Sequence, residues 1–153
     1  MAGSGETWAW PQRLHHEVPG WVKAGAVFHV RLRADVSQFP LLTDPELAER
    51  LLAAARNYDE RNEWRCLLML MMPDHVHALL AFPSGKAMAT VVGSWKRYAA
   101  RSLGVKWQVN FFDHRVRSER ELAETWIYVL RNPVAKGLCE KEEDWRWVCR
   151  TER

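Results

Sequence analysis

The chain has 153 residues, of which 48% are hydrophobic and 27% charged, and its formal net charge is +3. This composition is typical of a globular protein and excludes a disordered chain, because disordered chains are poor in apolar residues and carry uncompensated charge. The length fits one domain, since single domains cluster at roughly 100 to 150 residues. The longest apolar run, residues 66–72, is far shorter than the roughly 20 residues that span a bilayer, so we expect a cytoplasmic protein without a membrane partner.

The two ends and the cysteines give no clear signal of function. Residues 1–20 contain tryptophans and prolines without periodicity, so we expect a Trp-rich leader that either lies across the domain or is mobile. Residues 21–153 are then expected to form a single domain. The cysteines Cys66, Cys139 and Cys149 are far apart, lack a CxxC pairing and are odd in number, which is typical of reduced thiols outside a disulfide framework.

A half-buried strand is predicted over residues 26–33, where apolar and polar side chains alternate. One face carries Phe28, Val30 and Leu32, and the other carries His29, Arg31 and Arg33. Further along, Thr43 and Glu46 have the spacing of a capping box, and apolar residues then recur at helical spacing. We therefore expect a helix over about residues 44–61.

Two apolar runs, residues 65–72 and 75–82, predict a hairpin of central strands, because a Pro-Asp pair separates them. Ser84 is a candidate cap for the next helix, and Gly104 is expected to end that helix. The apolar face of the helix comprises Met88, Val91, Val92, Trp95, Ala99 and Leu103.

Residues 107–116 are a candidate for the last strand, and Ser118 with Glu121 forms a second capping box. The helix that follows is expected to run from 119 to about 131, where Pro133 ends it. The order β-α-β-β-α-β-α predicts the α+β class. We expect a ferredoxin-like split βαβ antiparallel sheet with helices on one or both faces and an added C-terminal helix that bears a tyrosine.

Basic residues are concentrated between Gly93 and Arg120, where seven basic residues accompany two acidic ones. The six assigned to DNA binding are Lys96, Arg97, Arg101, Lys106, Arg115 and Arg117. Trp95, Tyr98 and Trp107 lie among them, which favours a groove that follows a nucleic-acid backbone and stacks bases. The alternative, a solvated face over core aromatics, fits the sequence equally well.

Four residues have the chemistry of a metal-dependent site. His75 and His77 alternate with Val76 on a strand, so both imidazoles point to the same face and can bind one cation. Tyr128 is on the polar side of its predicted helix, with Asn132 four residues later on the same face. Oxygen ligands suit Mg²⁺, and imidazole extends the preference to Mn²⁺.

Two sequence segments carry a resemblance to a known family. Met72-Pro-Asp-His-Val-His-Ala-Leu-Leu80 resembles the His-hydrophobic-His (HUH) strand of single-tyrosine transposases, and Tyr128-Val-Leu-Arg-Asn-Pro-Val-Ala-Lys-Gly-Leu138 resembles the tyrosine helix of REP-associated tyrosine transposases. Weaker similarities are Phe28 to Arg33, Ser94 to Arg101, Trp107-Gln108, Phe112 to His114, and Arg117. Together they cover residues 26–137.

The resemblance implies a metal-dependent endonuclease and strand transferase that cuts single-stranded DNA beside hairpins of REP palindromes. Tyr128 would attack the phosphate, leaving a 5′-phosphotyrosine and a free 3′-OH. His75, His77 and Asn132 would hold Mg²⁺ or Mn²⁺. Such a protein, a monomer or a homodimer, would associate with the nucleoid when bound to DNA. Asn110 departs from the family, which usually has Gly or Pro there, and this affects target contacts more than chemistry.

Two other functions remain open. One is a catalytically silent nucleic-acid-binding regulator with the same fold, and the other is a plasmid initiator nuclease, which usually has Lys or a second Tyr where this chain has Arg131 and Asn132. We interpret His114 as a hydrogen-bonded structural residue outside the site, and His15 and His16 as solvated. Tyr98 lacks a following amide and is expected to stack or pack.

Overall fold

The computed structural model describes residues 26–151, so the predicted leader, residues 1–20, lies outside the described residues. The strands are β1 (Val27–Arg33), β2 (Arg65–Met72), β3 (His75–Ala81), β4 (Phe112–Arg115) and β5 (Val148–Arg150). The helices are α2 (Pro45–Glu60), α3 (Met88–Leu103) and α4 (Glu119–Ala135), and a 3-10 turn, η1, spans Glu142–Asp144. The order of the predicted elements is confirmed up to α4.

The five strands form one antiparallel sheet in the order β4-β1-β3-β2-β5. The four strands β4-β1-β3-β2 have the arrangement of a ferredoxin-like split βαβ fold, which confirms the predicted class. Strand β5, which the sequence did not predict, extends the β2 edge. It has only three residues, too few for an alternating pattern, and is held by backbone bonds such as Met71 N–H to the Trp147 carbonyl.

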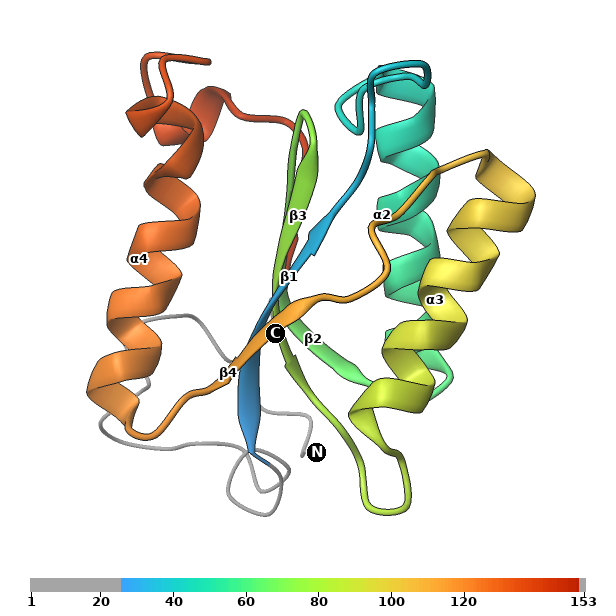
Figure 1. The fold of residues 1–153 in the computed structure, drawn as a ribbon. Helices are drawn as coiled ribbons and strands as arrows, with labels where there is room; N and C mark the ends of the chain where they lie inside the picture. The colour runs from blue at the N-terminus through green and yellow to red at the C-terminus, as the bar shows by residue number, and fades with distance from the viewer. Residues whose placement is uncertain (1–25, 152–153) are drawn as a thin grey trace.

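The helices cover both faces of the sheet: α2 and α3 lie on one face and α4 lies on the other (Figure 1). The α2–α3 core is centred on the buried indoles of Trp64 and Trp95, packed against Val30, Met69 and Val76. The α4 core is formed by Leu67, Leu68, Leu70, Met72 and Leu79 of the sheet with Leu122, Trp126 and Val129 of the helix. Strands β2 and β3 are buried on both faces, which explains their continuous apolar runs.

Two predicted helix caps were wrong. The N-cap of α2 is Asp44 and not Thr43, and the Asp44 carboxylate accepts from the Leu47 N–H at 3.2 Å. Helix α3 begins after Ala87, which makes no side-chain cap bond. Ser84 instead precedes Gly85, whose φ of 85° places this segment in a turn before the helix. A capping residue must lie directly before its helix, and spacing alone did not fix where these helices begin.

The last predicted strand is shorter than expected and the last helix is longer. Residues 107–111 are not part of β4, and Trp107 makes only an isolated bridge to Ala34. Helix α4 continues through Pro133 to Ala135. Proline removes one hydrogen bond from a helix, but Pro133 lies in the last turn, where Lys136, Gly137 and Leu138 N–H groups bond to carbonyls of residues 132–134. None of the helices in residues 26–151 is long and apolar enough to cross a membrane.

Candidate metal and tyrosine site

The predicted metal ligands His75 and His77 lie at the start of β3, on the face of the sheet that α4 covers. Their ring centroids are 4.9 Å apart, and His77 is only 1% exposed. The alternation of β3 places them in line with Leu79, which packs in the α4 core. The strand therefore fixes two imidazoles side by side, as their spacing predicted.

The surroundings of both histidines keep them neutral. Burial lowers the pKa of His77 to about 3, and the pKa of His75 is also lowered by burial, although its bond to Asp74 opposes the shift. His75 Nδ1 lies 2.8 Å from Asp74 Oδ1. That hydrogen bond lowers the pKa of Asp74, so the carboxylate is ionised and accepts from His75. Neutral imidazole is the form that binds metal ions.

Tyr128 is carried to this face by α4, whose apolar stripe anchors the helix on the sheet. Its ring is 5.9 Å from the His77 ring and almost perpendicular to it. The residue is 53% exposed, so a large substrate can approach it. The structure thus brings the predicted nucleophile next to the predicted ligand pair.

Asn132 is buried, with 5% exposure, although the helical pattern placed it on the polar side of α4. It lies near the end of α4, where the helix continues over the sheet. Its Oδ1 atom and the Nε2 atom of His77 are buried and lack a hydrogen-bond partner in the described part of the chain; the third such side-chain atom is Trp95 Nε1, in the other core. Buried polar atoms are rarely left unpaired.

These two unpaired atoms fit a hard or borderline cation. An amide oxygen and an imidazole nitrogen are both suitable ligands for Mg²⁺ or Mn²⁺, and a bound cation would satisfy both. Within residues 26–151 no cluster of three or more His, Cys, Asp or Glu side chains could hold a metal ion. The assignment of Asn132 as a ligand beside the two histidines therefore stays a prediction.

His29 is the residue of the site that the sequence did not single out. Its Nε2 lies 3.0 Å from His77 Nδ1, and its ring is 6.5 Å from that of Tyr128 and 5.9 Å from that of Phe112. The alternation of residues 26–33 already placed His29 on the face opposite Val30. What was missing was the pairing of β1 with β3, which puts this face beside His77.

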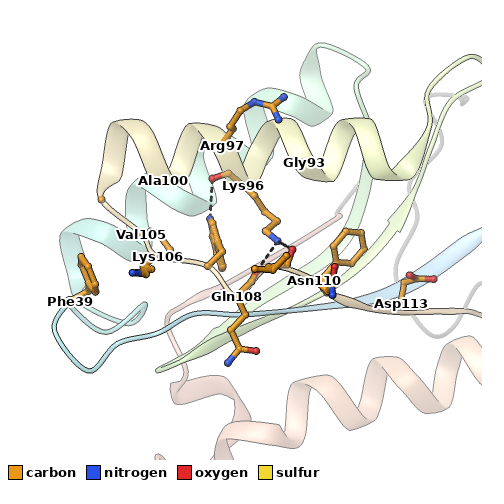
Figure 2. Close-up of a pocket in the computed structure, with 14 residues that line it drawn as sticks. Phe39, Gly93, Lys96, Arg97, Ala100, Val105, Lys106, Gln108, Asn110 and Asp113 are labelled. Carbon is orange, nitrogen blue, oxygen red and sulfur yellow. Dashed lines mark hydrogen bonds between the residues drawn. The ribbon is translucent and has the colours of Figure 1, made fainter.

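A cavity of about 920 Å³ lies on the other side of the sheet, between α3 and residues 104–111 (Figure 2). Its lining includes Lys96, Arg97, Lys106, Trp107 and Phe111. Three of the six predicted DNA-binding residues therefore share one cavity, which the sequence could not show because the strand that was expected over 107–111 is a loop.

The side chain of Lys96 is hydrogen-bonded to this loop. Its ammonium donates to the carbonyl oxygens of Gln108 at 3.2 Å and Val109 at 3.5 Å, as the dashed lines in Figure 2 show. It also lies 5.6 Å from the centre of the Phe111 ring, and burial lowers its pKa. In return, Trp107 Nε1 donates to the Lys96 carbonyl at 3.0 Å. These bonds hold residues 107–111 against α3.

The other basic candidates are exposed. Arg97 and Arg101 project from α3, Lys106 follows the helix, Arg115 is on β4, and Arg117 follows β4. Among the aromatic residues of this stretch, Trp95 is a core residue and no stacking platform, Trp107 is half-buried, and Tyr98 is 40% exposed. The core position of Trp95 agrees with the alternative interpretation, and DNA binding by the exposed basic residues stays a prediction.

Two further predicted placements can be compared with the structure. His114 is a hydrogen-bonded residue, as expected, and its partner is Glu121: Nε2 and Oε2 are 2.6 Å apart, which ties β4 to the start of α4. Tyr98 lies on α3, and α3 covers the opposite face of the sheet from α4, whose Tyr128 lies beside His77 (Figure 1). It is therefore remote from the ligand pair, which agrees with its exclusion as a nucleophile.

The fold and the site together define a class: a ferredoxin-like domain whose central strand presents a His-hydrophobic-His pair to a tyrosine-bearing helix. The family model described as "Transposase IS200 like" matches residues 27–115, more than half of the chain, and the chain belongs to this family. The matched segment contains His75 and His77 and ends before α4, so it does not include Tyr128 or Asn132.

Individual relatives agree with the family. A Haemophilus influenzae protein that is provisionally named a REP-associated tyrosine transposase is 24% identical, in an alignment that covers 56% of this chain and 58% of that protein. The chain thus matches little more than half of that relative's length. A solved structure of a REP-associated tyrosine transposase bound to a REP hairpin is 20% identical, with a TM-score of 0.71 over 81% of this chain and 76% of the other. That likeness confirms the fold.

Proposed function

We propose that this chain is a metal-dependent endonuclease and strand transferase of single-stranded DNA, with Tyr128 as the nucleophile. The observation that carries the proposal is the pair of buried, unpaired atoms, His77 Nε2 and Asn132 Oδ1. They come from two distant parts of the sequence that were both predicted as ligands, and Tyr128 lies beside them. Buried polar atoms are rarely left unpaired, and the other such side-chain atom in residues 26–151, Trp95 Nε1, lies apart from these two in the α2–α3 core.

The chemistry assigned to the site is a transesterification. The Tyr128 oxygen attacks the scissile phosphorus and gives up its proton to solvent, while the bond from phosphorus to the 3′ oxygen breaks. The departing 3′ oxygen takes up a proton, so the products are a 5′-phosphotyrosine and a 3′-OH. When bound by His75, His77 and Asn132, Mg²⁺ or Mn²⁺ supplies positive charge to the phosphate.

The exposed position of Tyr128 suits an attack on a flexible strand. The attacking oxygen must approach in line with the leaving oxygen, and an unpaired strand reaches that geometry more readily than a stacked duplex. Reversal of the same step by another 3′-OH joins strands without an external energy source. Strand transfer therefore needs no further catalytic group beyond those of cleavage.

The DNA substrate is proposed to pass around the β4 edge of the sheet. Phe111 and Phe112 are consecutive, yet Phe111 lines the basic cavity and Phe112 contacts His29 on the face with Tyr128. A strand bound in the cavity by Arg97 and Lys106 therefore needs to cross only β4 to reach the nucleophile. Exposed aromatic rings on this route can stack unpaired bases at about 1 to 3 kcal/mol each.

Hairpin DNA is the proposed partner, since the related solved structure is described as bound to a REP hairpin. Cleavage would then take place in the unpaired segment beside the stem.

The decisive experiment is a cleavage assay on a labelled single strand that contains an imperfect palindrome. The wild-type protein with Mg²⁺ or Mn²⁺ should give a covalent protein–DNA adduct that survives denaturing electrophoresis, and EDTA should abolish it. After proteolysis, the peptide that remains joined to the DNA should come from residues 119–135 and contain Tyr128. Binding without any adduct in either metal would instead identify a catalytically silent regulator.

A further inference from the structure

His29 and His77 make a direct contact between two buried imidazoles on neighbouring strands. The His29 Nε2 to His77 Nδ1 distance is 3.0 Å, and the rings stack with centroids 5.2 Å apart and planes at 21°. His29 is 9% exposed and His77 is 1% exposed. The two residues are diagonal in the β1–β3 ladder, where His29 pairs with Leu79 and His77 pairs with Arg31.

Only two proton arrangements are possible across this contact. The distance of 3.0 Å between the two nitrogens is that of a hydrogen bond, which holds one proton between them. One ring must therefore donate while the other accepts, and a neutral imidazole carries only one N–H. Either His77 Nδ1–H donates to His29, or His29 Nε2–H donates to His77 and leaves the His77 proton on Nε2.

The unpaired Nε2 atom of His77 distinguishes between these two arrangements. If the proton were on His77 Nε2, a buried N–H would have no acceptor in residues 26–151. An unsatisfied buried donor is costly, and a protonated Nε2 has no lone pair for a metal. We propose that His29 is a positioning residue that accepts from His77 Nδ1–H and so holds Nε2 of His77 free to bind the metal.

The Nδ1 atom of His75 is also hydrogen-bonded, but to a different kind of acceptor. The Asp74 carboxylate accepts from His75 Nδ1 at 2.8 Å, which leaves Nε2 of His75 as the free nitrogen. Both members of the ligand pair thus have Nδ1 occupied by a fixed acceptor. Outer acceptors that fix the tautomer and orientation of a metal-binding histidine typically change metal affinity about 10- to 100-fold. In this chain one acceptor is a carboxylate and the other is an imidazole from β1.

The inference rests on the proposed function, because it concerns the metal that His77 is proposed to bind. Its test measures Mn²⁺ affinity without DNA, from the electron paramagnetic resonance signal of free Mn²⁺. We expect His29→Leu, which keeps apolar volume but has no acceptor, to bind Mn²⁺ about 10- to 100-fold more weakly. His29→Gln, whose Oε1 replaces the accepting nitrogen, should recover most of the loss.

The matched control is His114→Leu. His114 is the direct ladder partner of His29 on β4 and makes its own bond to Glu121, so it lies close by without contacting His77. This variant should bind Mn²⁺ as the wild type does. Thermal unfolding of each metal-free variant separates loss of metal affinity from loss of fold.

A second measurement does not depend on any variant. Long-range ¹⁵N–¹H spectra of the wild-type protein at neutral pH distinguish the two imidazole tautomers, and His77 should carry its proton on Nδ1. A His77 proton on Nε2, or a folded His29→Leu variant with unchanged Mn²⁺ affinity, would overturn the inference and leave the proposed function standing. A wild-type protein that binds no Mn²⁺ would contradict the proposed function and this inference together.

Discussion

At the scale of single residues, removal of the Tyr128 hydroxyl should affect cleavage and not DNA binding. We expect Tyr128→Phe to abolish cleavage and adduct formation while DNA binding stays within a few-fold, because only the nucleophilic oxygen is removed. The measurement is adduct formation on a labelled strand beside a binding titration.

Tyr98→Phe is the matched control for this variant, because Tyr98 is also an exposed helical tyrosine and lies on the opposite side of the sheet. It should cleave as the wild type does. A covalent adduct formed by the Tyr128→Phe protein would show that another residue is the nucleophile.

The three proposed ligands should not be equivalent. We expect His75→Ala and His77→Ala to behave like the EDTA-treated enzyme at any practical metal concentration. Asn132→Ala should be milder and raise the Mg²⁺ concentration needed for half-maximal cleavage, because water can replace an amide ligand of Mg²⁺. Metal titrations of cleavage rate check this order.

Asn57→Ala serves as the comparison, because Asn57 is an exposed residue on α2 whose side-chain oxygen accepts from the Arg61 side chain at 3.3 Å. Its metal dependence should equal that of the wild type. Cleavage by either His variant at the wild-type rate would make the pair structural.

At the scale of elements, the start of α4 sets how firmly the tyrosine helix is held. Ser118 Oγ accepts from the Glu121 N–H at 3.0 Å. This bond confirms Ser118 as the N-cap of α4, as the second capping box predicted. We expect Ser118→Ala to lower the free energy of unfolding by about 1 kcal/mol, the usual cost of losing an N-cap. Urea unfolding of the metal-free protein measures this change.

Ser84→Ala provides the control, because Ser84 was also predicted as a cap and is not one in the structure. Its effect should stay within about 0.5 kcal/mol, as for most surface substitutions. Equal losses for both serines would argue that the Ser118 bond contributes nothing.

The loop after α3 gives the basic residues two different roles. Arg97→Ala and Arg101→Ala should weaken binding of all single strands alike and lower the slope of log affinity against log salt by about 0.7 per lost phosphate contact. Lys96→Ala should weaken binding with little change in slope, because its ammonium is bonded to loop carbonyls.

Fluorescence anisotropy between about 50 and 200 mM salt measures these slopes. Arg50→Ala, at an exposed α2 arginine paired with Glu46, should change neither affinity nor slope. A lower slope for Lys96→Ala would mean that its ammonium leaves the loop to contact phosphate.

At the scale of the whole molecule, the cavity and Tyr128 lie on opposite sides of the sheet, which meet at the β4 edge. A strand that passes between them must bend and unstack, which a duplex resists. We therefore expect a palindromic single strand to be cut much faster than its perfect duplex, and faster than a scrambled strand of equal length. Initial rates on the three substrates provide the test.

Equal rates on duplex and single strand would contradict the path around β4. Equal rates on palindromic and scrambled strands would contradict the preference for hairpin DNA, while the proposed nuclease activity on single strands would stand.

The amino-acid sequence determined by itself the features that depend on local periodicity. The alternation of residues 26–33, the paired apolar runs of β2 and β3 and the helical stripes fix which side chains share a face. Together with the element order, they were sufficient for the ferredoxin-like class. The HUH strand and the tyrosine helix were enough to indicate the family, since both motifs are local.

The tertiary structure alone decided what depends on pairing between distant segments. Strand pairing placed His29 against His77, and docking of α4 buried Asn132, which a helical wheel had placed on the polar side. Part of the expected last strand is a loop beside a cavity, and Lys96 donates to the carbonyls of that loop. Side-chain periodicity assigns each residue to a face of its own element, but only packing decides what that face meets.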